Sequence, residues 1–140
     1  MILTDKEKML LTPTYYVYKM YVPFQDATFI PLNIDTDDYK FGNVTMPRVH
    51  AIAARAKDGH VWLALTNVDP NQPTDIHVRL EGISPKSVTG EVLTAAQVDS
   101  VNTFTAPNTV LPKPFTARSA SGELELKLSP KSVTVVRVDE

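Results

Sequence analysis

Three histidines, His50, His60 and His77, are the first candidates for a metal site or a catalytic base. Imidazole is the commonest metal ligand and titrates closest to neutral pH. An Asp58-Gly59 turn between two apolar runs would set His60 at the tip of a hairpin. The same turn would place His50 opposite Asn67, so these two histidines would not be cross-strand neighbours. Since the chain has no cysteine to complete a ligand set, we expect solvent-facing histidines and no bound metal.

The one cluster of carboxylates is Asp35, Asp37 and Asp38, and such a cluster suggests calcium. Its spacing does not fit an EF-hand loop, because Tyr39 and Lys40 stand where an oxygen ligand and a glycine are required. A looser calcium site is the alternative to a solvated turn after the first strand. We expect the solvated turn.

Glutamates are the next candidates, because glycoside hydrolysis needs two carboxylates that face one cleft. Glu123 and Glu125 share a strand face opposite the neighbouring leucines, which predicts solvated side chains, and Glu81 adjoins a glycine turn. The chain also lacks a Gly-x-Ser-x-Gly nucleophile motif and a glycine-rich phosphate loop. The residues themselves therefore predict no catalytic residue, no metal site and no cofactor site.

Trp62 is the one tryptophan, and with the tyrosines it could form a platform on which a sugar ring stacks. Trp62 lies in the run VWLALT, on the strand face opposite Val61, Leu63 and Leu65. Four of the five tyrosines, however, are crowded into one predicted helix. Packing within the core or against another domain is therefore the favoured role for Trp62, and it stays a weak candidate for sugar stacking.

That helix is predicted over residues 12–21, the one segment with clear helical signals. Thr12 can cap it, Pro13 suits the first helical position, and Pro23 should end it. Only Lys19 is charged, so the helix is apolar nearly all round. A helix of this kind is expected to be buried on more than one side.

Beyond Pro23 the pattern changes to the alternation of β-strands. A β-sandwich of the jelly-roll or Greek-key type, an all-β fold preceded by one N-terminal helix, is predicted by these short strands and the turn residues between them. Pro31 marks the first strand as an edge or a bulge. Residues 94–121, rich in Asn, Pro, Thr and Ala, are predicted to be a long crossover with short extended pieces. The predicted strands cover residues 27–34, 48–55, 61–67, 76–80, 88–93, 124–128 and 132–139.

Composition limits the class of protein without naming it. The 140 residues suit one domain, and the net charge of −2 argues against a dedicated nucleic-acid binder. No apolar run is long enough for a transmembrane helix. The first eight residues place apolar side chains before the charged ones, the reverse of a signal peptide. We therefore expect a soluble domain with neither nucleic acid nor membrane as a partner.

Three segments carry a family pattern. Residues 1–21 (MILTDKEKMLLTPTYYVYKMY), continued by FQDAT at 24–28, resemble glycoside hydrolase family 51, the α-L-arabinofuranosidases. Residues 101–112 (VNTFTAPNTVLP) are similar to a segment late in the C-terminal domain of that family. Residues 128–138 (LSPKSVTVVRV) resemble its closing strand. These matches span nearly the whole chain in the same order as in the family.

The resemblance implies a division of the chain and a role for it. Residues 1–24 would be the terminal barrel helix and linker, and residues 25–140 the C-terminal β-sandwich. Family members carry both catalytic glutamates on a (β/α)8 barrel, and neither catalytic motif maps onto this chain. We therefore expect a non-catalytic C-terminal fragment that is inactive alone. Its barrel interface would be an apolar patch that includes some of the following residues: Tyr15, Tyr16, Tyr18 and Met20.

The resemblance also implies partners. The parent enzyme would hydrolyse terminal α-L-arabinofuranosides of arabinan or arabinoxylan with retention, and its barrel would be the partner of this domain. The family's sandwich also receives chain from the protein's own N-terminus, so the isolated piece would leave an unpaired sheet edge that invites homo-oligomer formation. The alternative function is a stand-alone carbohydrate-binding module that acts through Trp62. The sequence leaves the cellular compartment undecided, because the family has both intracellular and exported members.

Overall fold

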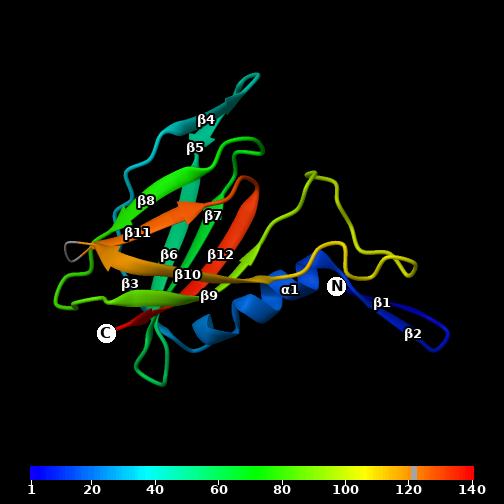
Figure 1. The fold of residues 1–140 in the computed structure, drawn as a ribbon, viewed down its shortest axis with the longest axis horizontal. Coiled ribbons are helices and arrows are strands. Elements are labelled where there is room, and N and C mark those ends of the chain that lie inside the picture. Colours follow the sequence, from blue (N-terminus) through cyan, green and yellow to red (C-terminus); the bar gives the residue numbers. More distant parts are fainter. Residues whose placement is uncertain (121–122) are drawn as a thin grey trace.

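The structure, a computed structural model, describes residues 1–120 and 123–140 and is dominated by one antiparallel sheet of eight strands (Figure 1). The strand order is β3-β6-β7-β12-β9-β10-β11-β8, so β3 and β8 are the two edges. The predicted all-β fold with one N-terminal helix is confirmed. The strands of this sheet are β3 (Thr28–Ile30), β6 (Val49–Arg55), β7 (Val61–Asn67), β8 (Thr74–Val78), β9 (Ser87–Leu93), β10 (Lys113–Ala120), β11 (Glu123–Leu128) and β12 (Ser132–Asp139).

The sheet curls so that its two halves face each other like the layers of a sandwich (Figure 1). Strand alternation explains the core between them: Leu124, Leu126 and Leu128 of β11 point inward and are at most 1% exposed. They pack with Val61 and Leu63 of β7 from the opposite half. The alternating glutamates and lysine of β11 stay outside the core, as their spacing predicts.

Helix α1 (Pro13–Met20) and the short 3-10 helix η1 (Val22–Phe24) lie against the outer face of the sheet (Figure 1). Met20 packs there on Ala64 and Val135, which point away from the sandwich core. The predicted cap on α1 is wrong in one respect, because the Thr12 hydroxyl donates to the carbonyl oxygen of Met1, 2.7 Å away, and caps no helical N–H. The start of the helix is therefore tied to the start of the chain.

The predicted hairpin around Asp58-Gly59 is confirmed, but its register is shifted by one residue. Arg55 pairs with Val61, and the three-residue loop 57–59 ends with Gly59 at a φ of +87°. A three-residue hairpin loop needs a left-handed residue at this position, which glycine adopts without strain. His50 consequently lies opposite Thr66 rather than Asn67.

Two further hairpins were not predicted, and both stand away from the sandwich (Figure 1). The first comprises β1 (Ile2–Asp5) and β2 (Lys8–Leu11), and the second β4 (Asp38–Phe41) and β5 (Val44–Pro47). The carboxylates expected in a solvated turn therefore lead into a strand, with Asp38 as its first residue. The turns of the two hairpins place Lys6 and Gly42 at positive φ angles. A lysine at such a position gives no turn signal in the sequence.

The predicted crossover over residues 94–121 is confirmed only in its first part. Residues 94–112 form an irregular connection, whereas β10 occupies most of the remainder and pairs with β9 over residues 113–118. Residue 121 lies outside the described residues. No helix in the described part of the chain is long and apolar enough to cross a membrane.

Candidate functional site

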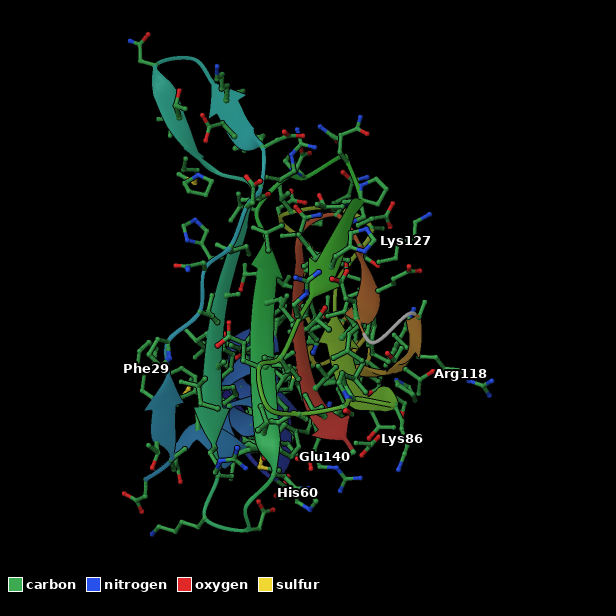
Figure 2. The ribbon with its side chains drawn as sticks, turned by 90° about the vertical axis from the view of Figure 1, so that its left-hand side faces the viewer. Phe29, His60, Lys86, Arg118, Lys127 and Glu140 are labelled. Carbon is green, nitrogen blue, oxygen red and sulfur yellow. The ribbon has the colours of Figure 1, made fainter. Side chains whose placement is uncertain are left out.

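An open groove of about 970 Å³ lies between the two edges of the sheet. One side is β8 with the residues that follow it, and the other is β3 with the extended segment 31–35. Between them lie inward-facing residues of β6 and β7. Figure 2 looks onto this side of the molecule, with β3 at the left below the label of Phe29.

Apolar side chains dominate the walls of the groove. They pack against the sandwich core on one side and are only half-buried, because nothing in the described part of the chain covers the other side. The polar residues Asp75, His77, Arg79 and Glu81 stand along the rim. An apolar trough of this kind suits a segment of polypeptide that adds to a sheet edge. The half-buried apolar residues are Ile30, Leu32, Ile34, Val78, Leu80 and Ile83.

The strands that flank the groove also have unused pairing capacity. β3 pairs only with β6, and β8 only with β11, among the described strands. Pro31 stops β3, because proline has no N–H to donate to a ladder, and this confirms the predicted edge. An edge strand presents a row of free N–H and C=O groups to any added strand. The groove therefore has the backbone chemistry and the apolar lining that a further β-strand needs.

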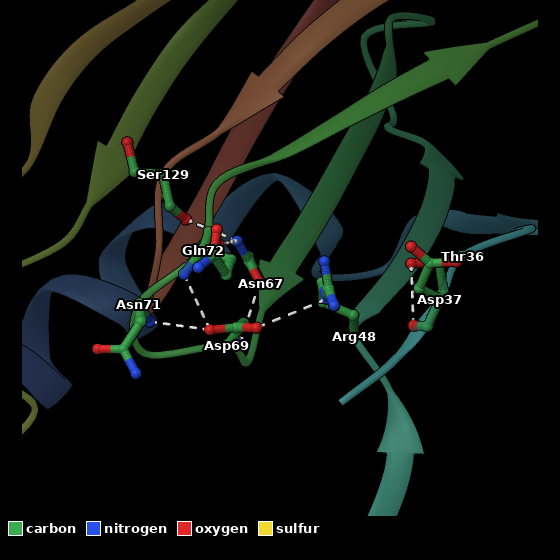
Figure 3. A network of polar contacts seen from close by, with 8 residues as sticks. All are labelled: Thr36, Asp37, Arg48, Asn67, Asp69, Asn71, Gln72 and Ser129. Atoms are coloured by element: carbon green, nitrogen blue, oxygen red, sulfur yellow. Dashed lines mark hydrogen bonds and ion pairs between the residues drawn. The ribbon is translucent and has the colours of Figure 1, made fainter. Parts of the chain in front are cut away.

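Near the end of β7, a buried carboxylate organises the loop that leads to β8 (Figure 3). Asp69 accepts hydrogen bonds from the backbone N–H groups of Asn71 at 2.8 Å and Gln72 at 2.9 Å. The Nε atom of Arg48 lies 3.6 Å from its other oxygen. Burial alone raises the pKa of Asp69, but these donors together hold it below its usual value.

Asn67 completes this network from the last residue of β7. Its side-chain amide donates to the carbonyl oxygens of Gln72 at 2.9 Å and Ser129 at 3.1 Å, and its Oδ1 accepts from the N–H of Asp69. The contacts with Gln72 and Asp69 stay within the β7–β8 connection, whereas the contact with Ser129 reaches the turn before β12. The network therefore fixes the turn before β8 and the turn before β12.

The match to known proteins agrees with a structural role. The sequence model of the α-L-arabinofuranosidase C-terminal domain covers residues 1–132. The chain belongs to this family.

Relatives of this arabinofuranosidase domain are parts of much longer chains. An intracellular exo-α-L-arabinofuranosidase of Bacteroides ovatus is 39% identical over 140 residues, which are 99% of this chain and 27% of the relative. The crystal structure of the family 51 arabinofuranosidase of Xanthomonas axonopodis pv. citri matches with a TM-score of 0.96 and 41% identity, over 99% of this chain and 28% of that one. The chain thus spans little more than a quarter of the length of these relatives.

A more distant solved structure shows that the fold extends beyond close sequence similarity. The thermostable family 51 enzyme of Thermotoga petrophila RKU-1 has a TM-score of 0.83 at 24% identity, over 99% of this chain and 31% of that one. The arabinofuranosidase domain is therefore a β-sandwich that tolerates extensive sequence change.

The histidines and acidic residues of the arabinofuranosidase domain form no metal site in the described part of the structure. No three His, Asp or Glu residues gather there in a way that could hold a metal ion. His50, His60 and His77 are all exposed, on β6, at a hairpin loop and on β8. Glu125 is exposed as expected, whereas Glu123 forms an ion pair with Arg79, whose Nε lies 2.8 Å from the carboxylate.

Trp62 lies on the outer face of β7, beneath the helical segment of the arabinofuranosidase domain. It packs on the cluster that contains Met20 and Val135, and its indole N–H is buried with no hydrogen-bond partner among the described residues. An open stacking platform would present the indole ring and its N–H to solvent. The packing of Trp62 therefore favours the structural role over sugar binding.

The helix residues expected at a barrel interface divide between two faces. Tyr18 is 64% exposed, whereas Met20 is 5% exposed and packs on the sheet of the same domain. Tyr15 and Tyr16 are half-buried and contact each other edge to face, with ring centroids 5.5 Å apart. The groove itself had no separate sequence signal, because its lining residues follow the pattern of ordinary core positions.

Proposed function

We propose that the chain acts as the non-catalytic C-terminal domain of an enzyme that hydrolyses terminal α-L-arabinofuranosides of arabinan or arabinoxylan with retention. Both catalytic carboxylates would lie on the catalytic barrel of that enzyme. The role of the domain is to stabilise that barrel by packing against it. Family membership supports the parentage, and the location of the polar networks inside turns supports a structural role.

The open groove carries this proposal. The groove measures about 970 Å³, is mostly apolar and lies between two unpaired sheet edges. An additional segment of chain would fill it and complete the sandwich. The resemblance to family 51 supplies the occupant, a strand from the N-terminal part of the same enzyme. Such a strand pairs its backbone with β8 or β3 and buries its apolar side chains on Ile34, Leu80 and Ile83.

Adding the missing strand as a peptide tests the groove. Overlapping peptides of about ten residues, a length that suits a single strand, are taken from the N-terminal part of the Xanthomonas relative and mixed with the chain. One peptide should raise the Tm and slow hydrogen exchange of the amides in β8 and β3. A scrambled peptide of the same composition is the control. If every peptide leaves exchange at both edges unchanged, the groove is not a strand site.

A further inference from the structure

Strand β8 lies at an edge of the sheet, and its residues line the open groove (Figure 1). Among the described strands it pairs only with β11, so its other side presents unpaired N–H and C=O groups. The alternation of its side chains continues past Val78, because Arg79 bonds to Glu123 on the outer face and Leu80 packs on the core. Residues 74–80 therefore form one edge with an outward and an inward face.

The sequence of this edge, TDIHVRL, is complementary to itself when two copies run antiparallel. With a two-fold axis at His77, Asp75 of one copy would lie opposite Arg79 of the other on the outward face. Ile76 would lie opposite Val78 on the inward face, where both side chains are apolar. A two-fold interface makes each of these contacts twice. Both faces of the edge therefore suit a second copy of the same strand.

The charges of β11 extend this complementarity beyond the edge. Within the chain, Glu123 pairs with Arg79, and Lys127 faces Asp75 in the β8–β11 register. In the paired copies, one row across four strands would read Glu123, Arg79, Asp75 and Lys127, with alternating sign. Opposite charges on facing residues of antiparallel strands stabilise the pair, and like charges destabilise it. Every neighbour in the row is therefore an attractive one.

Charge and alternation also select this register over its neighbours. Moving the axis from His77 to Val78 would set Asp75 opposite Glu81, which are like charges. An axis between two residues would set an outward side chain opposite an inward one, against the pleat of the sheet. The axis at His77 avoids both faults.

We propose that the chain by itself associates with a second copy through β8, with the two-fold axis at His77. The strands β10, β11 and β8 of one copy then continue into β8, β11 and β10 of the other as one sheet. A single strand pair is smaller than the interface of a stable complex, so we expect a Kd on the order of 100 µM. The inference stands independently of the proposed function, because the strand invoked there can pair with β3 instead.

Sedimentation velocity of the wild-type chain from about 10 µM to about 1 mM, on either side of the expected Kd, tests the association. The mean mass should rise from 15.5 kDa towards twice that value. Hydrogen exchange of the β8 amides should slow as the concentration rises, whereas exchange in β3, the other edge, should be unchanged. A mass of 15.5 kDa at every concentration would overturn the proposal.

Two charge variants and their mixture test the register. Asp75→Arg leaves positive side chains facing each other at both contacts, and Arg79→Asp leaves negative ones, so each variant alone should dimerise about tenfold more weakly. An equimolar mixture of the two variants restores opposite charges at both contacts and should dimerise like wild type. A role of these side chains within one copy would not produce this rescue. Arg118→Asp, an exposed position on β10, is the matched control and should dimerise like wild type.

Thermal unfolding at low concentration shows whether each variant is folded, and the wild-type concentration series decides the edge even if one is not. Dimers that both charge variants leave unchanged would overturn the proposal. So would folded variants without rescue in the mixture. Slower exchange at high concentration in the β4–β5 hairpin, with none in β8, would also overturn it and would assign the contact to that hairpin.

Discussion

At the scale of single residues, the buried polar side chains and the one tryptophan of the described chain hold turns and packed surfaces together. The Asp69 side chain accepts from backbone N–H groups of its own loop, the Asn67 amide donates to backbone carbonyls of two loops, and Asn102 ties a long connection to β2. Trp62 is covered by the helical segment. These side chains therefore serve the fold, and this can be checked one substitution at a time.

Gly90 is required by a close approach of two strands. A Cβ atom at this position would lie 2.1 Å from the carbonyl oxygen of Val135 on β12, which is backbone and cannot rotate away. Gly90→Ala should therefore destabilise the domain by about 3 kcal/mol. Urea unfolding measures the change. Gly59→Ala is the control. A Cβ atom at Gly59 would meet open space, so this variant should lose only about 1 kcal/mol of stability, from its positive φ angle. Equal losses of stability for the two variants would contradict the close contact between the strands at Gly90.

Asp69 should make the stability of the domain depend on pH in the acid range. Its pKa is lower in the folded chain than in the unfolded chain, where an aspartate titrates near ~3.9. Its stabilising effect is therefore complete above about pH 4 and is lost as the pH falls through the folded pKa. The free energy of unfolding of wild type should exceed that of Asp69→Asn at pH 7, and the gap should narrow towards pH 2. A gap that is constant over this range would show that the charge of Asp69 does not matter.

Trp62 should behave as a packing residue. Trp62→Ala removes an indole that packs on the Met20 cluster, so it should cost about 2 kcal/mol or more. Titration of the wild-type chain with arabino-oligosaccharides should give no saturable binding. Saturable binding that disappears in a folded Trp62→Ala variant would favour the carbohydrate-binding alternative instead.

At the scale of elements, the sequence predicts those strands whose inward and outward residues alternate. The leucines of β11 and the valines of β12 were visible in this way, and Pro31 marked an edge correctly. The two hairpins outside the sandwich were missed, because each of their strands has only 4 residues, too few for an alternating pattern to stand out. The groove was also missed, because its half-buried lining residues have the sequence pattern of ordinary core positions.

The two faces of α1 give a prediction at this scale. Met20 is buried against the sheet, whereas Tyr18 projects into solvent in this chain. Met20→Ala should therefore destabilise the chain by about 2–3 kcal/mol, and Tyr18→Ala should change it by less than about 0.5 kcal/mol. Thermal or urea unfolding of the two variants compares the faces directly. A larger loss for Tyr18→Ala than for Met20→Ala would mean that the helix packs with its other side.

At the scale of the whole molecule, the described chain has a complete core and two incomplete surfaces. The core closes around β7, β11 and β12, which accounts for a fold that persists among distant relatives. The groove leaves two sheet edges unpaired, and the β1–β2 and β4–β5 hairpins carry exposed apolar side chains such as Met9 and Phe41. Both surfaces are what we expect of a domain that works as part of a larger enzyme.

The most direct test of the account is hydrolysis of a chromogenic α-L-arabinofuranoside by two purified proteins. One is the chain alone, and the other is the chimera in which it replaces the matching region of the Xanthomonas enzyme. The account predicts no hydrolysis by the chain alone, and a kcat/KM for the chimera within about tenfold of the Xanthomonas enzyme. Hydrolysis by the chain alone, or a folded chimera without activity, would contradict it.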